Sequence, residues 1–229
     1  MRRVAVIAAM PGELAPLVRG WRRESRGGVR LWRLPRADGE WIAACAGMGP
    51  GAAARAFAEA ERGGPLDLAL SVGWAGALSA EHALGSACAV AGVVDDRTGE
   101  RFPCGPGSCW LVTAAGVADP AEKRRLLAAH GAGLVDMEAA AIARLAAGRG
   151  VAFRCIKGVS DGPGDRLPDF GAFIAADGSF RTARFAAFAL VRPWLWPALG
   201  RIGRASRRAS RSVARAALEI LGARAGADP

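Results

Sequence analysis

The sequence lacks any uninterrupted run of about 20 apolar residues, the length that an α-helix needs to cross a bilayer. Its first apolar stretch is short and is followed by Pro11-Gly12-Glu13, so we interpret it as a strand and not as a signal peptide. We therefore expect a cytoplasmic protein without a transmembrane helix.

Residues that bind metals or act as nucleophiles are also scarce. The two histidines, His82 and His130, are both distant in sequence from any candidate nucleophile. The five cysteines form no Cys-x-x-Cys pair, and their odd number indicates reduced thiols. The Gly-x-Ser-x-Gly motif of serine hydrolases is absent. We expect neither a metal ion nor a cofactor.

Basic charge is concentrated near one end of the chain. The formal net charge is +10, and residues 192–229 hold eight arginines against Glu219 and Asp228. A pI near 10.9 makes nucleic acid the first partner to consider, but the charge belongs largely to a tail. The length of 229 residues suits one α/β domain with a large core. We assign residues 1–191 to a catalytic domain and residues 192–229 to a basic C-terminal tail.

The clearest local pattern is strand, helix, strand. An apolar run at 134–137 precedes helix formers at 139–149, and a second apolar run spans 151–159. This order predicts two parallel strands with a right-handed crossover. Parallel strands point their carboxyl ends to one edge of the sheet, where α/β folds bind ligands. We therefore expect Glu138 and Asp161 to face one cleft.

Other segments predict further strands and helices around this unit. Asp119 and Pro120 form the start signal of a helix that continues to about His130. The other expected helices cover 14–21, 52–62 and most of 170–191. The other expected strands cover 3–9, 28–35, 40–46, 66–72, 85–94 and 110–115, with a hairpin at 37–39 and a loop at 95–108.

Several predicted strands end in turns with polar or glycine-rich sequences. Besides Glu138 and Asp161, these are Met10–Glu13, Gly73–Gly76 and the segment 115–117. Carboxylates beside glycines, without metal ligands, point to acid–base chemistry on a small molecule. Gly47-x-Gly49-x-Gly51 before a helix is either a phosphate cradle or a tight turn. We favour the turn, because the motif lacks a lysine and a further glycine.

These motifs together resemble those of the nucleoside phosphorylase/nucleosidase superfamily, over Val4 to about Phe188. The resemblance is greatest to its methylthioadenosine/S-adenosylhomocysteine nucleosidases. It implies an α/β fold, a three-layer sandwich with a central twisted mixed β-sheet, and a homo-oligomer. It rests on Ala9–Glu13, Gly47–Ala54, Val72–Gly76, Val135–Ala139 and Val159–Asp161.

The resemblance implies a role for each matching residue. Asp161 would be the acid that protonates purine N7, and Glu13 would activate the attacking water. Glu138 would hold ribose hydroxyls, with Met137 under the sugar. Phe170 either lines the pocket of the 5′-substituent or belongs to the core. The full set of substrate-binding candidates is Met137, Glu138, Gly73, Ser160, Trp74, Val117 and Phe170.

Departures from the family pattern favour hydrolysis over phosphorolysis. Ser71 stands where the phosphorylases have a phosphate-binding arginine, and Trp74 stands where they have a serine. The acidic Glu13 would repel phosphate. The phenylalanine that stacks on adenine has no clear match, since residues 115–117 align with it.

The tail has the pattern of a basic amphipathic helix. Trp194 and Trp196 precede arginines that share one helical face, beside an apolar stripe interrupted by Ser206. Such a pattern is typical of a membrane-interface helix. A dimer-packing helix, a disordered tail and nucleic-acid binding are the alternatives, and nucleic acid is the least favoured. The arginines are Arg201, Arg204, Arg208, Arg211 and Arg215; the stripe is Leu199, Ile202, Ala209, Val213, Ala216 and Ile220.

With this tail, the chain resembles the hopanoid-associated members of the superfamily. The resemblance implies removal of adenine from adenosylhopane to give ribosylhopane, at the inner face of the membrane. A soluble methylthioadenosine-type nucleosidase and a non-catalytic membrane- or nucleic-acid-binding relative remain alternatives.

Overall fold

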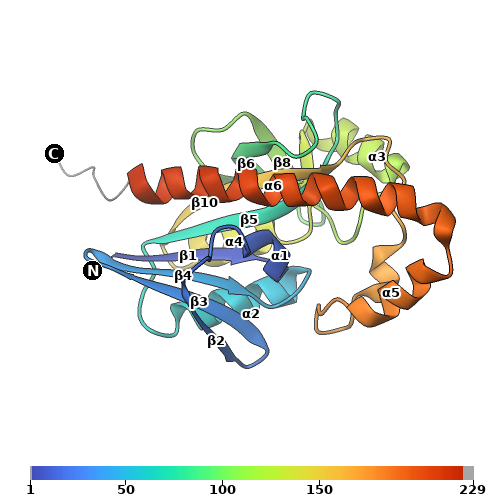
Figure 1. Ribbon diagram of the computed structural model, residues 1–229. Helices are drawn as coiled ribbons and strands as arrows, with labels where there is room; N and C mark the ends of the chain where they lie inside the picture. Colours follow the sequence, from blue (N-terminus) through green and yellow to red (C-terminus); the bar gives the residue numbers. More distant parts are fainter. Residues whose placement is uncertain (1, 224–229) are drawn as a thin grey trace.

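The computed structural model describes residues 2–223, and the last six residues of the predicted tail lie outside this range. A central mixed sheet is covered by helices on both faces, as expected (Figure 1). The helices are α1 (Pro11–Leu14), α2 (Pro50–Glu61), α3 (Pro120–His130), α4 (Ala139–Ala147), α5 (Thr182–Leu190) and α6 (Trp196–Ala223), with short 3₁₀ turns η1 (Phe170–Phe173) and η2 (Pro193–Leu195).

The strands run through the molecule as one continuous sheet. They are β1 (Arg2–Ala8), β2 (Arg22–Arg26), β3 (Val29–Arg36), β4 (Gly39–Cys45), β5 (Leu68–Ala77), β6 (Ala87–Asp95), β7 (Arg101–Pro103), β8 (Cys109–Thr113), β9 (Leu134–Asp136) and β10 (Ala152–Asp161). The pairs β5–β10, β10–β6, β6–β8, β8–β9 and β9–β5 close a ring of five strands. β1, β4, β3 and β2 extend the sheet from β5.

Alternate residues of the inner strands belong to two separate hydrophobic cores, one on each face of the sheet. On β1, Val4 and Val6 face α1 and α6, whereas Ala5 and Ile7 face α2 and α4. Because successive strand residues point to opposite faces, strands buried on both sides have near-continuous apolar sequences. This explains why β1 was recognised from its composition.

The expected parallel pair of strands is wrong. β10 runs parallel to β5, but β9 runs antiparallel to it, so β9 and β10 are antiparallel to each other. Two apolar runs with a helix between them do not determine whether the two strands run parallel or antiparallel. On β5, the partners of β9 are Gly76 and Ala77, near the carboxyl end of that strand. Glu138, which follows β9 by two residues, is therefore still brought to the edge of the sheet where β5 and β10 end.

Other boundaries also differ from expectation. β5 continues through Gly73–Gly76, which we had expected to be a turn. The expected helix over 14–21 is wrong, because α1 ends at Leu14 and turns follow it. β2 was not predicted, because its sequence is polar. The segment 170–191 is helical only at its two ends. The hairpin of β3 and β4 is confirmed, and so is α3 with its Asp119 cap.

The described part of the predicted tail is packed on the sheet. α6 lies across β10, β5 and β6, and Figure 1 shows it spanning this face of the molecule. Its stripe residue Val213 is buried in the same core as Val4 and Leu70, so this stripe is not free to meet a membrane. The expected arginine face is exposed on the other side of the helix. Among residues 2–223, no helix is both long and apolar enough to cross a bilayer.

Candidate active site

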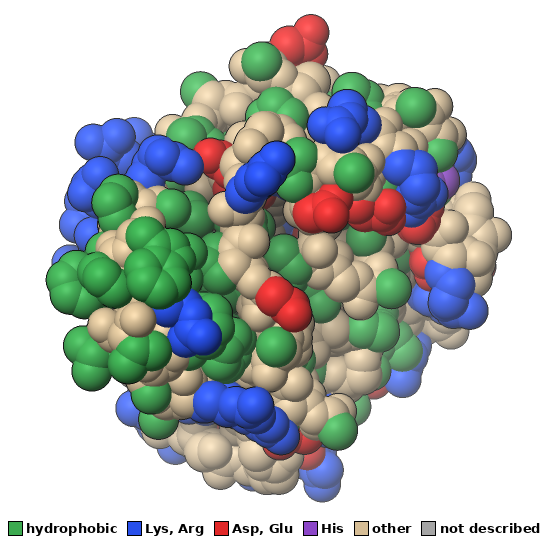
Figure 2. Space-filling view, turned by 90° about the vertical axis from the view of Figure 1, so that its right-hand side faces the viewer, with side chains coloured by type: hydrophobic (Ala, Val, Ile, Leu, Met, Phe, Trp, Pro, Cys, Tyr) green, Lys and Arg blue, Asp and Glu red, His purple; other side chains and the backbone are tan. Residues whose placement is uncertain are grey.

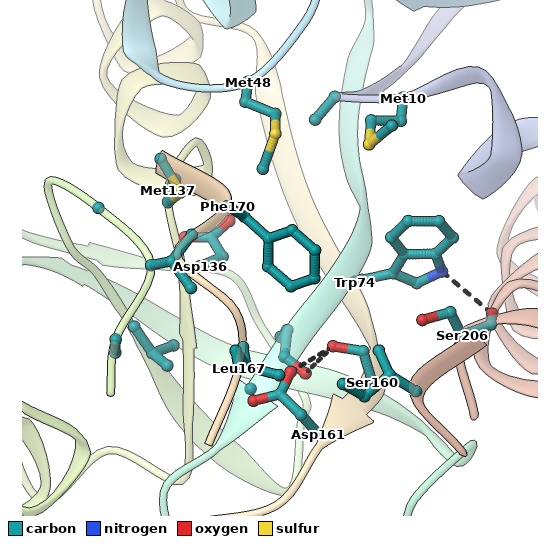
Figure 3. A pocket seen from close by; sticks show the side chains of 18 of the residues that line it. Met10, Met48, Trp74, Asp136, Met137, Ser160, Asp161, Leu167, Phe170 and Ser206 are labelled. Atoms are coloured by element: carbon teal, nitrogen blue, oxygen red, sulfur yellow. Dashed lines mark hydrogen bonds between the residues drawn. The ribbon is translucent and has the colours of Figure 1, made fainter. Parts of the chain in front are cut away.

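One cavity of about 260 Å³ collects most of the predicted site residues. It lies where β5 and β10 end, and α1, α3, α5 and α6 also contribute to its wall. Figure 3 shows Trp74 and Phe170 pointing into it from different elements. The predicted residues that line it are Glu13, Trp74, Val117, Met137, Glu138, Ser160, Asp161 and Phe170.

Gly73 is the predicted residue that the cavity lining does not include. Its φ of 140° favours glycine, and a Cβ there would lie 2.7 Å from Glu13 Oε1. Gly73 therefore makes room for the Glu13 carboxylate and does not meet the cavity itself.

Glu13 is buried at the start of the short α1. Its carboxylate accepts backbone N–H groups from Met10 and Trp74, both at 2.7 Å. Burial raises the pKa of Glu13 above 4.5, against the lowering effect of these N–H groups and of Lys157. A buried carboxylate held by two donors is rigid, and its raised pKa makes it a stronger base.

Glu138 is held at the start of α4, where its carboxylate accepts the Gly49 N–H at 2.6 Å. Burial raises its pKa to about 8, and the nearby Asp136 carboxylate adds to the rise. The glycine-rich turn at 47–51 therefore binds a carboxylate of this chain through its backbone. This contact accounts for the turn without a phosphate.

A buried ion pair, which the sequence analysis missed, lies beside Glu138. Lys157 of β10 contacts Asp136 of β9 at 2.8 Å, and both side chains are almost fully inaccessible. Asp136 also accepts the hydroxyl of Thr113 at 2.7 Å and the Ala139 N–H at 2.9 Å. The pair joins two strands under the cavity. The only available signal was a lysine within the apolar run 151–159.

Asp161 lies at the end of β10 with hydrogen-bond donors on both oxygens. The Ser160 hydroxyl is 2.6 Å from Oδ1, and it also lies 3.2 Å from the Ala75 carbonyl oxygen. Oδ2 accepts from the ammonium group of Lys123, which reaches it from α3. Sequence reasoning did not single out Lys123, because it sits beside Arg124 and Arg125 on an ordinary helix.

Trp74 is fixed in the cavity by α6. Its indole N–H lies 2.9 Å from the Ser210 hydroxyl. It also lies 3.1 Å from the Ser206 carbonyl oxygen (Figure 3). Ser210 in turn donates to the Ser206 carbonyl at 3.0 Å. The serine that interrupts the apolar stripe therefore marks the place where α6 meets the cavity.

An aromatic cluster forms the remaining wall. Phe170 packs on Phe185 with ring centroids 5.3 Å apart, and both rings line the cavity. Phe173 and Phe188 extend the cluster away from it. Phe170 thus lines the cavity from η1 and is only partly buried, and its contact with a 5′-substituent stays a prediction.

Comparisons with known proteins concern the family and the fold. The model of a family described as the phosphorylase superfamily matches residues 98–192. The predicted resemblance to this superfamily is confirmed. No curated protein sequence matches the chain.

Solved structures with the same fold cover nearly the whole chain. Futalosine hydrolase of Helicobacter pylori has a TM-score of 0.73 at 12% identity, covering 97% of this chain and 98% of its own. The methylthioadenosine/S-adenosylhomocysteine nucleosidase of Neisseria meningitidis, bound to methylthio-immucillin-A, has 0.71 at 18%, covering 97% and 100%. Arabidopsis thaliana methylthioadenosine nucleosidase has 0.71 at 16%, covering 100% and 98%. At these identities the likeness establishes the fold.

Proposed function

We propose that the protein is an enzyme that hydrolyses the N-glycosidic bond of a purine nucleoside. The observation that carries this proposal is the meeting of Glu13, Glu138 and Asp161 in one cavity, from three separate elements. The names of the structural relatives, which are nucleosidases and a futalosine hydrolase, support the same class of reaction.

Each carboxyl group has a place in this reaction. Asp161 and Ser160 form the end of the cavity that would hold the purine, and proton transfer to N7 would help the base to leave. Glu138 and Met137 would hold the ribose. Glu13 would take a proton from the water that attacks C1′. One carboxyl thus assists departure and another assists the nucleophile, as in glycoside hydrolysis generally.

Water suits this cavity better than phosphate. Among residues 2–223, no arginine lines it, and its one basic lining residue, Lys123, is paired with Asp161. Ser71, at the position of the phosphate-binding arginine, is completely buried and lies outside the cavity lining. Glu13 would repel a phosphate anion.

The same two helices that line the cavity, α5 and α6, also border an exposed apolar surface, which supports a lipid-linked substrate. Phe185 lines the cavity on α5, and Leu190 at the end of this helix is 69% exposed. We define the apolar knob as Leu190, Val191, Trp194 and Trp196, all of them exposed. Figure 2 shows hydrophobic side chains gathered on one side of this end of the molecule, with Lys and Arg side chains near them.

Tryptophans and arginines together suit a membrane surface. We therefore propose the peripheral contact at the apolar knob and not along α6, whose stripe residues Ala209 and Val213 are buried against the sheet. An adenosyl lipid, such as adenosylhopane, could reach the cavity from a bilayer beside the knob. Hydrolysis at the inner face of the membrane would then yield ribosylhopane. A homo-oligomer remains a prediction from the resemblance.

An adenine-release assay tests the function. Methylthioadenosine, inosine and adenosylhopane in vesicles would be offered with and without phosphate. We expect release without phosphate, and fastest from the lipid. A requirement for phosphate with ribosyl 1-phosphate as product would instead identify a phosphorylase, and preference for methylthioadenosine a nucleosidase of that type. Asp161→Asn should lower turnover by about 10²–10⁴-fold; full activity in a folded variant would refute the assigned site.

A further inference from the structure

The Lys123–Asp161 ion pair is almost fully buried. The two side chains are 1% and 7% exposed, although Lys123 belongs to α3, whose neighbouring basic residues face solvent. The ammonium group also donates to the Gly162 carbonyl oxygen at 2.6 Å. A Cβ at Gly76 would lie 2.9 Å from Asp161 Oδ2 and 3.1 Å from Lys123 Cε, so a glycine there gives the pair its space.

The choice of lysine at this position is informative. The chain has 31 basic residues, and all but Lys123 and Lys157 are arginines. Both lysines are buried against aspartates beside the cavity. An arginine could supply the charge, but its guanidinium does not release a proton in proteins, whereas an ammonium group can.

Asp161 is arranged as an acceptor. Its Oδ1 accepts from Ser160 and its Oδ2 from Lys123, so each carboxyl oxygen faces a donor hydrogen. A carboxyl group in this geometry can gain a proton directly from one of these two donors. We propose that Lys123 supplies the proton that Asp161 passes to the departing purine. This inference rests on the proposed function and adds a residue to it.

The step balances as follows. When the C1′–N9 bond breaks, its electron pair goes to the purine, and a proton moves to N7. The Lys123 ammonium group gives this proton to Asp161 Oδ2 and becomes a neutral amine, and Asp161 passes the same proton to N7 and ends as the carboxylate with which it began. Water forms the new bond to C1′ and loses a proton to Glu13. Proton exchange with solvent after product release restores Glu13 and Lys123.

The test is the pH dependence of adenine release in Lys123→Met, Lys123→Arg and the wild-type protein, each with its best substrate from the series above. In Lys123→Met the carboxyl at position 161 must take its proton from solvent. Release should be about 10²-fold slower at pH 8 and should fall about tenfold per pH unit above neutrality, unlike the wild type. Glu13, Glu138, Asp136, Lys157 and Asp165 surround the cavity or its loop in every variant, so they affect all profiles alike.

Lys123→Arg separates charge from proton supply. It keeps the cation, and we expect the same slow release; wild-type rates would show that charge alone suffices and would overturn the proposal. Thermal unfolding checks that each variant is folded. If Lys123→Met does not fold, Lys123→Met with Asp161→Asn removes both charges, and this double variant should be no slower than Asp161→Asn alone. A further loss would overturn the proposal.

Arg124→Met is the matched control, because it also replaces a basic side chain by methionine, at the next and exposed residue of α3. It should leave the rate and the pH profile unchanged. A Lys123→Met protein with the wild-type rate and profile refutes the role of Lys123 alone. A wild-type protein that releases no purine from any nucleoside refutes the proposed function itself.

Discussion

At the scale of single residues, backbone N–H groups hold the carboxylates of the candidate site in place by hydrogen bonds. Glu13 receives two backbone N–H groups, and Glu138 receives one from Gly49. Burial raises the pKa of both residues above 4.5. Neither carboxylate has a direct ion-pair partner among the described residues, so each keeps lone pairs for a ligand.

This chemistry predicts the acid limb of the pH–rate profile. Glu13 must be ionised to accept a proton from water, and its pKa is raised, so activity should increase with pH through a value above 4.5. Glu13→Gln should slow adenine release by about 10²–10⁴-fold and remove this limb. Steady-state rates between pH 4 and 8 would check it. An unchanged acid limb in the variant would assign that limb to another group.

At the scale of elements, α6 completes the site because it lies unusually close to β10. A Cβ at Gly158 would lie 2.7 Å from Ala209 Cβ and 2.9 Å from Val213 Cγ2. Small residues on both sides therefore set the spacing between helix and sheet. This spacing brings Ser206 and Ser210 to the Trp74 indole.

Gly158→Ala should therefore disturb both stability and the site. We expect the free energy of unfolding to fall by about 1–3 kcal/mol, because overpacking forces the helix outward. KM should rise, because Trp74, which lines the cavity and is hydrogen-bonded to α6, would move with the helix. Gly203→Ala on the same helix is the control, since a Cβ there meets nothing within 4 Å. It should increase stability by up to about 1 kcal/mol through helix propensity. Denaturant unfolding of both variants decides whether close packing matters.

The same scale shows how far sequence reasoning reaches. The Asp119-Pro120 start signal and the β3–β4 hairpin depend on local chemistry, so they were predicted correctly. The direction of β9 depends on its partner β5, and no local pattern records that pairing. Lys123 looks like any helix lysine until the fold places Asp161 beside it. Cavity-lining residues in recognisable motifs were predicted, whereas Lys123, from a distant element, was not.

At the scale of the whole molecule, the cavity and the apolar knob lie near one end. α5 carries Phe185 into the cavity and ends at Leu190, and α6 begins at Trp196 and contributes Ile202 to the cavity wall. Trp194 between them is 70% exposed, which is costly for a large apolar side chain in water. In the described chain, the two consecutive α-helices α5 and α6 thus connect an exposed apolar surface with the candidate active-site cavity.

The proposed contact between the apolar knob and a bilayer can be tested by flotation with vesicles. Full-length protein should float with vesicles that contain anionic lipid, whereas Trp194→Ser with Trp196→Ser should remain largely unbound. Because the double variant changes the knob and not the cavity, its turnover of methylthioadenosine should equal that of the wild type. Its rate of adenine release from a vesicle-borne adenosyl lipid should fall by at least about tenfold. Leu218→Ser is the control, because Leu218 is a 47% exposed leucine on α6 outside the knob. Equal flotation of all three proteins would exclude the knob as the membrane contact.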